Sequence, residues 1–239
     1  MSLAQHVEMD PERLLLKLST GKRLTAAEVR SVVEVLEGSS EDSGLDDSYS
    51  CLLIIGRAGL KEHRRLVERH LETKDPLTVS LALEILCLQW RTTEDYLERA
   101  LDFALGVSWD EDDDVRGMSL RILGEYLRDA WNEVIPTSGS DKQLKVLGLV
   151  LSVFDDDALD PLVRQAAYNS LCRAAGKPWE ELPSECVLLD LAVGSKDVDW
   201  TMLERLRQLS LSSPEASESP SSGRSSVKSS LRIVPPGTT

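Results

Sequence analysis

The sequence predicts an all-helical protein, a right-handed α-solenoid of about five stacked antiparallel helix pairs over residues 10–211. Apolar residues recur along most of the chain with the roughly 3.6-residue period of an α-helix, and no run shows the alternation of a β-strand. Three segments also share one template of residue types without gaps, as stacked repeats do. From residue 212 the composition changes to Ser, Pro and Gly, so a disordered tail is expected over 212–239.

The helical segments follow one another along the chain. LTAAEVRSVVEVLEG begins with Thr25 and Glu28 at the spacing of a capping box and ends at Gly38. TTEDYLERALDFALG closes at Gly106 after an apolar stripe made of Leu97, Ala100, Leu101, Ala104 and Leu105. Similar stripes predict further helices over residues 46–58, 62–72, 77–90, 115–130, 142–154, 162–175 and 198–210.

The repeat template occurs in DPLTVSLALEIL from Asp75, DDDVRGMSLRIL from Asp112 and DPLVRQAAYNSL from Asp160. The opening Asp accepts hydrogen bonds from the free N–H groups of a helix start and suits the positive end of the helix dipole. Each copy then has a β-branched residue, a small residue and a Leu at fixed places: Thr78, Ala82 and Leu86; Val115, Ser119 and Leu123; Val163, Ala167 and Leu171. A lone helix pair cannot bury such a stripe, so repeats of this kind stack.

The last two copies resemble the first helix of HEAT and HEAT-like repeats, whose signature is an Asp, then Val-Arg, then a small residue three positions on. The resemblance implies a solenoid of HEAT-like repeats over residues 75–211. It also implies that the Asp and the Arg link successive repeats, here Asp112 with Arg116 and Asp160 with Arg164. The first copy departs from the signature with Val79 in place of the Arg. Residues 1–74 keep helix pairs without the template and are interpreted as an N-terminal helical or capping region.

Charge and cysteine usage limit the class of protein. The formal net charge of −14 disfavours nucleic acid as a partner and favours a basic protein. The apolar runs are too short to span a membrane and no secretory signal is recognised, so a cytoplasmic protein without membrane contact is expected. The cysteines are scattered without CxxC spacing, which predicts buried reduced thiols and no metal site.

The stretch SWDEDDDVRGMSLRILG, residues 108–124, places five carboxylates directly before a helix. An EF-hand is excluded, because Val115 stands where that loop needs its Gly and Arg121 where it needs its Glu. One Asp, either Asp112 or Asp114, is enough to cap the helix, so the other acids are predicted to be free for a partner: Asp110, Glu111 and Asp113. The turn FDDDALD, residues 154–160, adds the candidates Asp155, Asp156 and Asp157.

Two interpretations of these acidic turns stay open. Equivalent turns of a stacked solenoid line up on one edge, where these and the acidic turns at 41–47 and 72–75 would form a ridge. The ridge binds a basic partner, or it is a solvated edge that keeps the protein soluble. Trp109 and Trp179 likewise allow two interpretations, as packing residues or as partly exposed anchors of a binding surface.

These patterns predict a protein-binding scaffold that has no catalytic activity, metal or cofactor and holds a basic protein partner. Neutralisation of a toxin is one form of this function. HEAT-like repeats also occur in bilin lyases, which help to attach a pigment, and in DNA glycosylases, which cradle the duplex with a basic concave face. The acidic charge disfavours the glycosylase, and the sequence carries no signal for the lyase.

Overall fold

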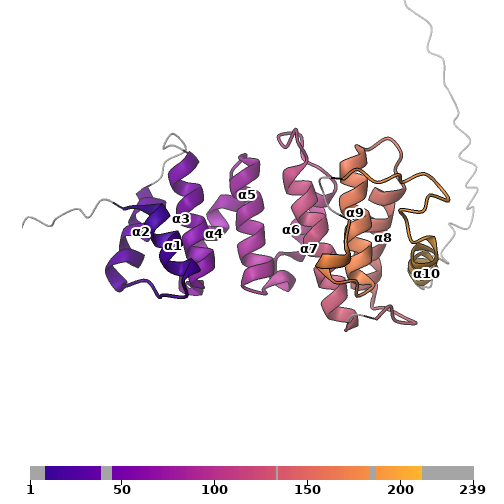
Figure 1. Cartoon of the computed structure of the whole chain (residues 1–239), viewed down its shortest axis with the longest axis horizontal. Coiled ribbons are helices and arrows are strands. Elements are labelled where there is room, and N and C mark those ends of the chain that lie inside the picture. Colours follow the sequence, from indigo (N-terminus) through magenta and orange to yellow (C-terminus); the bar gives the residue numbers. More distant parts are fainter. Residues whose placement is uncertain (1–8, 39–44, 133, 184–186, 212–239) are drawn as a thin grey trace, which may run out of the picture.

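The computed structural model of the chain describes residues 9–38, 45–132, 134–183 and 187–211, with the backbone alone at 45–47. These residues form ten α-helices and no strand, which confirms the predicted all-helical class. The helices follow one another along the long axis, from α1–α3 at one end to α10 at the other (Figure 1). Their bounds are α1 Pro11–Ser19, α2 Ala26–Gly38, α3 Leu45–Ala58, α4 Arg64–Arg69, α5 Pro76–Leu83, α6 Thr93–Ala104, α7 Asp114–Trp131, α8 Asp141–Asp155, α9 Pro161–Ala174 and α10 Trp200–Leu211.

The helix ends largely follow the predicted signals. Thr25 and Glu28 form the expected capping box, because each backbone N–H donates to the other side chain, at 2.7 and 3.3 Å. The stripe before Gly106 is buried except for Leu105, which is 64% exposed just past the end of α6, so its assignment to the stripe was wrong. Helix α5 continues as a π-helical turn, Glu84–Gln89, which the apolar pattern did not distinguish from an α-helix. The pattern also did not single out α1, which Asp10 caps by accepting from the Arg13 N–H.

The three template copies begin α5, α7 and α9, which contact one another in this order, and α3 contacts α5. Helix α6 packs on α7, and helix α8 packs on α9 and α10. The template positions share their burial: the small residues and the Leu residues of all three copies have no exposed surface, namely Ala82, Ser119, Ala167, Leu86, Leu123 and Leu171. The shared sequence pattern therefore corresponds to a shared position of each helix in the core.

The arginines of the last two copies connect each helix to the end of the helix before it. The Arg116 Nε donates to the Ala104 carbonyl oxygen at the end of α6, at 3.1 Å. The Arg164 Nε donates to the Phe154 carbonyl oxygen at the end of α8, at 2.9 Å. The acids that pair with them are not those that the resemblance implied: Asp113 faces Arg116 at 3.5 Å and Asp157 faces Arg164 at 2.8 Å. Asp112 is exposed, and Asp160 accepts from the Leu162 N–H of its own helix.

The Cys51, Cys87 and Cys172 side chains are buried, as the sequence predicted, and form no disulfide within the described residues, while Cys186 lies outside them. Burial raises the pKa of the Cys87 thiol to about 12, so this thiol stays protonated at neutral pH. Within the described ranges, every helix is too short or too polar to cross a membrane. The predicted tail, 212–239, lies outside the described residues.

Helices α7 and α9 approach each other closely at Gly124. A Cβ atom placed on Gly124 would lie 2.8 Å from both the Cα and the carbonyl oxygen of Ser170. Gly117, on the same helix, has no atom within 4 Å of such a Cβ. A side chain at Gly124 would therefore push two backbones apart, whereas one at Gly117 would meet open space.

We predict that Gly124→Ala lowers the free energy of unfolding by about 1–3 kcal/mol, because the methyl group overpacks the contact between α7 and α9. The matched variant Gly117→Ala should be neutral or raise it by up to about 1 kcal/mol, because Ala favours a helix over Gly. Urea denaturation of the two variants measures both values. Equal stability of the two variants would mean that α7 and α9 do not meet at Gly124.

A second prediction concerns the Glu28 carboxylate, which accepts from the Lys17 ammonium at 2.6 Å. This hydrogen bond, with that from the Thr25 N–H, lowers the pKa of Glu28 to about 2. The ionised form therefore stabilises the fold above about pH 4.3, the unfolded pKa, and this contribution is lost as the pH falls towards 2. Glu28→Gln should be less stable than wild type by about 1 kcal/mol at pH 7.

The difference between wild type and Glu28→Gln should vanish near pH 2, as followed by thermal melting across the pH range. Glu34→Gln, an exposed substitution on the same helix, serves as the control and should match wild type at neutral pH. A constant difference between wild type and Glu28→Gln at every pH would contradict the assignment of the charge to this pair.

Candidate functional site

Two adjoining hollows lie along α7. One, of about 340 Å³, lies between the first half of α7 and α9. The other, of about 610 Å³, lies between the second half of α7 and the segment from Cys87 to Asp95. Both are lined by Arg121 and Trp179, so they meet there, and we call them together the α7 groove. Its main lining residues are Asp112, Asp113, Asp114, Met118, Arg121, Glu125 and Arg128 before and along α7, Leu162, Gln165 and Asn169 on α9, and Trp179.

The α7 side of the groove is a stripe of residues spaced by three or four positions. Asp114, Met118, Arg121, Glu125 and Arg128 follow this spacing, which places them on one face of the helix. The opposite face carries the apolar template residues and is buried. The amphipathic pattern of α7 therefore fixes which side chains line the groove.

The acidic run before α7 divides its carboxylates between structure and surface. Asp110 is only 5% exposed, and its carboxylate accepts from the backbone N–H groups of Asp114, Val115 and Arg116 at 3.1, 2.9 and 3.3 Å. The expectation that Asp112 or Asp114 caps the helix and leaves Asp110 free was therefore wrong. The backbone of Asp113 adopts the left-handed conformation with φ of 56°, which turns the chain so that Asp110 reaches the helix start.

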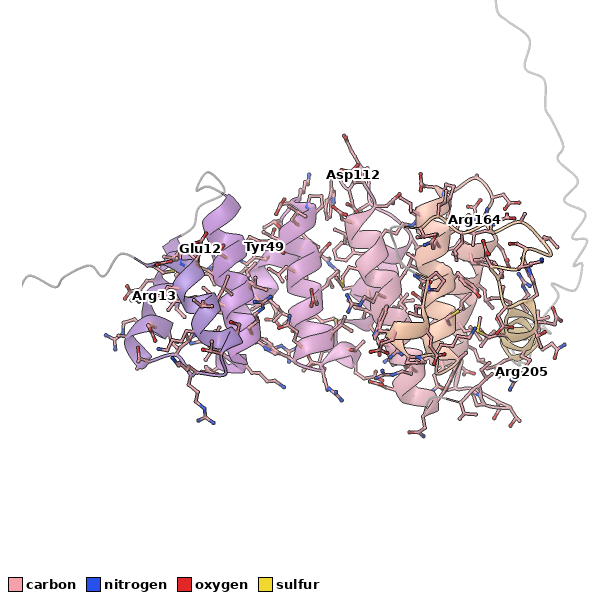
Figure 2. All side chains as sticks on the ribbon, viewed as in Figure 1. Glu12, Arg13, Tyr49, Asp112, Arg164 and Arg205 are labelled. Atoms are coloured by element: carbon pink, nitrogen blue, oxygen red, sulfur yellow. The ribbon has the colours of Figure 1, made fainter. Side chains whose placement is uncertain are left out.

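Two carboxylates of this run line the groove without a cation to neutralise them. Asp112 and Asp114 are exposed and form no ion pair with any described residue. Asp113 also lines the groove, but it faces Arg116. Glu111 is exposed beside them and does not line the groove. Asp112 marks one edge of the molecule in Figure 2, where the turn before α7 lies.

The carboxylates of the second acidic turn, Asp155, Asp156 and Asp157, form ion pairs or hydrogen bonds within the protein. Asp155 pairs with Arg207 at 2.6 Å, and Asp157 with Arg164 at 2.8 Å. Asp156 accepts from the Ala158 N–H within the turn, at 3.0 Å. None of these three lines the α7 groove. The side chains of the acidic turn at 41–47 lie outside the described residues, and in the turn at 72–75 Glu72 pairs with Arg99 while Asp75 caps α5.

The structure separates the two candidate tryptophans. Trp109 is half-buried and packs edge-on against Phe103, with ring centroids 6.1 Å apart, and it does not line the groove. Trp179 is 38% exposed and lies in the groove, where the guanidinium carbons of Arg121 and Arg173 are 4.6 and 5.0 Å from its ring centroid. Cation–π contacts with two helices thus hold the Trp179 ring in place while part of it stays open to solvent.

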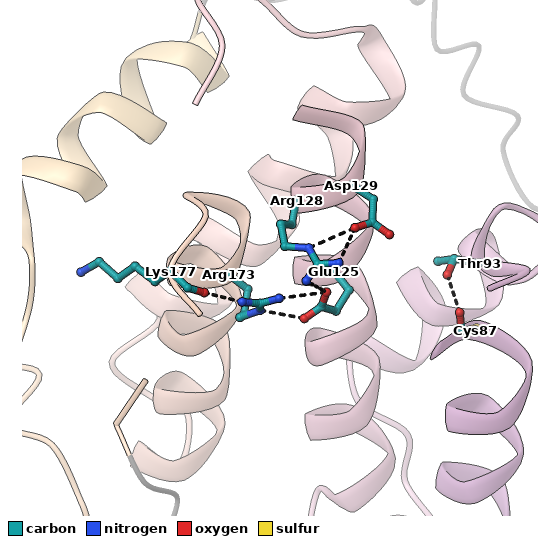
Figure 3. A network of polar contacts seen from close by, with 7 residues as sticks. All are labelled: Cys87, Thr93, Glu125, Arg128, Asp129, Arg173 and Lys177. Carbon is teal, nitrogen blue, oxygen red and sulfur yellow. Dashed lines mark hydrogen bonds and ion pairs between the residues drawn. The ribbon is translucent and has the colours of Figure 1, made fainter. Parts of the chain in front are cut away.

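An ion-pair network beside Trp179 holds the Arg173 side chain in place. The buried Arg173 guanidinium binds both oxygens of Glu125, at 2.7 and 3.2 Å, and donates to the Lys177 carbonyl oxygen (Figure 3). Glu125 also accepts from Arg128, at 3.0 Å, and Arg128 reaches Asp129 (Figure 3). Because Arg173 lies on α9 and Glu125 on α7, this network joins the two helices at the floor of the groove.

Sequence reasoning missed two groove residues, Arg121 and Asn169. The Arg121 Nε is buried and has no hydrogen-bond partner, and the guanidinium forms no ion pair with a described residue. Asn169 is 7% exposed; its Nδ2 donates to the Pro183 carbonyl oxygen at 3.4 Å, while its Oδ1 has no partner among the described residues. Only the packing of α7, α9 and the segment after α9 shows that these groups lie together, so no local sequence signal marks them.

Among the described residues, the groove combines two carboxylates without an ion pair, the partly buried Arg121 without one, a buried amide and an exposed indole. Groups of these kinds are suited to contacts with charged, backbone and apolar surface. Among the described residues, no group of three or more His, Cys, Asp or Glu is placed to hold a metal ion. Comparison of the chain with family models, curated proteins and solved structures found no match.

We predict that Asp110→Ala lowers the free energy of unfolding by about 1–2 kcal/mol, because three N–H groups at the start of α7 lose their acceptor. Asp112→Ala, two residues away and exposed, should change it by less than about 0.5 kcal/mol. Urea denaturation measures both. Equal losses in the two variants would show that Asp110 is not the cap of α7.

Proposed function

We propose that the chain is a protein-binding module without catalytic activity, an acidic, HEAT-like, right-handed α-solenoid that binds a basic protein partner through the α7 groove. The observation that carries the proposal is the presence, in one groove, of an exposed and anchored Trp179 and of two carboxylates, Asp112 and Asp114, that form no ion pair with a described residue. Aromatic residues held in place at a concave surface are favoured anchors of protein interfaces. The carboxylates select a cationic partner.

The distribution of the other charges supports this choice. The chain has 41 acidic and 27 basic residues, and an acidic body attracts a basic partner before contact. Two carboxylates of the second acidic turn are paired with arginines, whereas Asp112 and Asp114 in the turn before α7 form no ion pair with a described residue. Neutralisation of a basic toxin is one form that such binding takes. The buried thiols of Cys51, Cys87 and Cys172, which form no disulfide among the described residues, suit a reducing compartment, and we place the function in the cytoplasm.

The stacked arrangement is itself part of the proposal. The series of contacts from α3 through α5 and α7 to α9, with α6 and α8 behind, supports a solenoid of helix pairs. The equivalent hydrogen bonds of Arg116 and Arg164 to the preceding helices support a repeated unit. In such a stack the α7 groove lies between neighbouring repeats, where partners of solenoid proteins have access to several helices at once.

The test uses a charge-neutralised variant, Glu111→Gln/Asp112→Asn/Asp114→Asn, and a matched control with the same change in charge, Glu12→Gln/Glu34→Gln/Glu37→Gln. The control residues are exposed and lie on α1 and α2, at the far end of the molecule, where Figure 2 labels Glu12. The partner is captured with the wild-type chain, purified, and its association rate is measured by surface plasmon resonance at low and high salt.

We predict a basic partner whose association with the groove variant is slower by about tenfold at low salt, because steering by rim charges is lost. High salt should reduce the difference, because ions screen these charges within about a Debye length of 10 Å. The control variant should behave as wild type. An acidic partner, or equal rates for both variants, would overturn the proposal.

We further predict that Trp179→Ala weakens binding by about 2 kcal/mol, mainly through faster dissociation, because an anchored interface residue is lost. Trp109→Phe should leave the affinity unchanged, since Trp109 packs against Phe103 outside the groove. The same surface plasmon resonance experiment measures both variants. Equal effects of the two substitutions would remove Trp179 from the interface.

A further inference from the structure

The α7 groove is acidic at one end and holds Arg121, which pairs with no described carboxylate, where its two hollows meet. We infer that it takes an extended peptide segment of the partner, which places a basic side chain at Asp112 and Asp114 and a carboxylate on Arg121. This inference rests on the proposed function and adds to it the form and the charge pattern of the bound segment. It begins from the difference between Arg121 and the arginines around it.

The neighbouring arginines have anionic or carbonyl partners within the protein. Arg128 and Arg173 bind Glu125, and Arg116 binds the end of α6. Arg121 lies where the two hollows meet, has a buried Nε without a partner and contacts the ring of Trp179. A buried donor left unpaired costs about 1–3 kcal/mol, which an acceptor from a ligand would restore. Because its Nε is buried without a partner among the described residues and its side chain lines the groove, Arg121 is inferred as the site for an anionic group of the partner.

Asn169 provides a second unpaired group in the same groove. Its Oδ1 is an acceptor without a partner among the described residues, and the residue is only 7% exposed. It lines the hollow between α7 and α9 together with Arg121. The Asn169 Oδ1 thus matches the N–H of a polypeptide backbone, while Arg121 is left for the carboxylate.

The Asn169 Oδ1 acceptor favours an extended segment of the partner over a helix. The backbone groups of a bound helix are paired within the helix, whereas those of an extended chain are free to bind side chains. Helix α9 already holds a non-helical segment of its own chain in this way. The Gln165 side chain donates to the Val187 carbonyl oxygen at 3.0 Å and accepts from the Leu189 N–H at 2.9 Å. Asn169 lies one turn further along α9, beside the groove, and carries the same kind of side-chain amide as Gln165.

The spacing along α7 sets the spacing in the bound segment. Asp114 and Arg121 are seven residues apart on the helix, which corresponds to about 10 Å at roughly 1.5 Å per residue. An extended chain advances about 3.3 Å per residue and covers this distance in about three residues. Because alternate side chains of an extended chain share one face, the bound segment has a Lys or Arg and an Asp or Glu two or four positions apart, with apolar surface between them for Trp179 and Met118.

The experiment selects binders from a random dodecapeptide display library on the full chain, in parallel for wild type, Arg121→Gln and the Glu111→Gln/Asp112→Asn/Asp114→Asn variant. Arg205→Gln is the matched arginine control, because Arg205 is exposed on α10, away from the groove (Figure 2). Wild type and the control should enrich peptides with the basic and acidic pair. Arg121→Gln should lose the acidic residue alone, and the acidic-turn variant the basic residue alone.

One enriched peptide is then synthesised with its acidic residue intact or replaced by the corresponding amide, and both are titrated by fluorescence anisotropy. The amide should bind wild type at least about tenfold more weakly, and this difference should disappear on Arg121→Gln and persist on Arg121→Lys. Enrichment of basic peptides with no dependence on Arg121 would overturn this inference and leave the proposed function standing. Enrichment of amphipathic helices, or of no peptide, would overturn it as well, whereas an acidic captured partner would overturn the proposed function itself.

Discussion

The close contact between α7 and α9 is the constraint on which the candidate site depends. Gly124 allows the backbone of α7 to approach Ser170 of α9 without an intervening side chain. One residue further, Glu125 binds Arg173 across the same contact. The glycine sets the distance between the helices and the ion pair fixes their register, so the position of the groove above them follows from packing in the core.

The carboxylates of the chain fall into two groups: some stabilise the fold through hydrogen bonds or ion pairs, and others are exposed and form no ion pair with a described residue. Asp110 and Glu28 serve helix starts, and Asp157 pairs with an arginine near the end of a helix. Asp112 and Asp114 have no such role and lie together at one end of the groove. A like-charged pair without a structural partner repels in the folded state, and a cationic ligand removes that repulsion.

The sequence predicted the helices well because each of them buries an apolar stripe with the helical period, and the template copies occupy equivalent places in the core. It was less successful with the site, because the site depends on turns and on contacts between distant segments. The left-handed backbone of Asp113 transfers the capping role to Asp110, and no pattern in a run of acids indicates this. Trp109 lies beside the acids in the sequence yet packs against Phe103, while the distant Trp179 reaches the groove.

Arg121 shows how the same helix serves both the core and the surface. Its neighbours Leu120 and Ile122 have no exposed surface, so the helical period fixes the direction in which the Arg121 side chain leaves α7. That direction leads toward the ring of Trp179, while Glu125 on the same face of α7 pairs with Arg128 and Arg173. The indole lies over the guanidinium without neutralising it, because a cation–π contact leaves the charge in place. Packing on one face of α7 thus keeps a cation available on the other, within a chain that has carboxylates in excess.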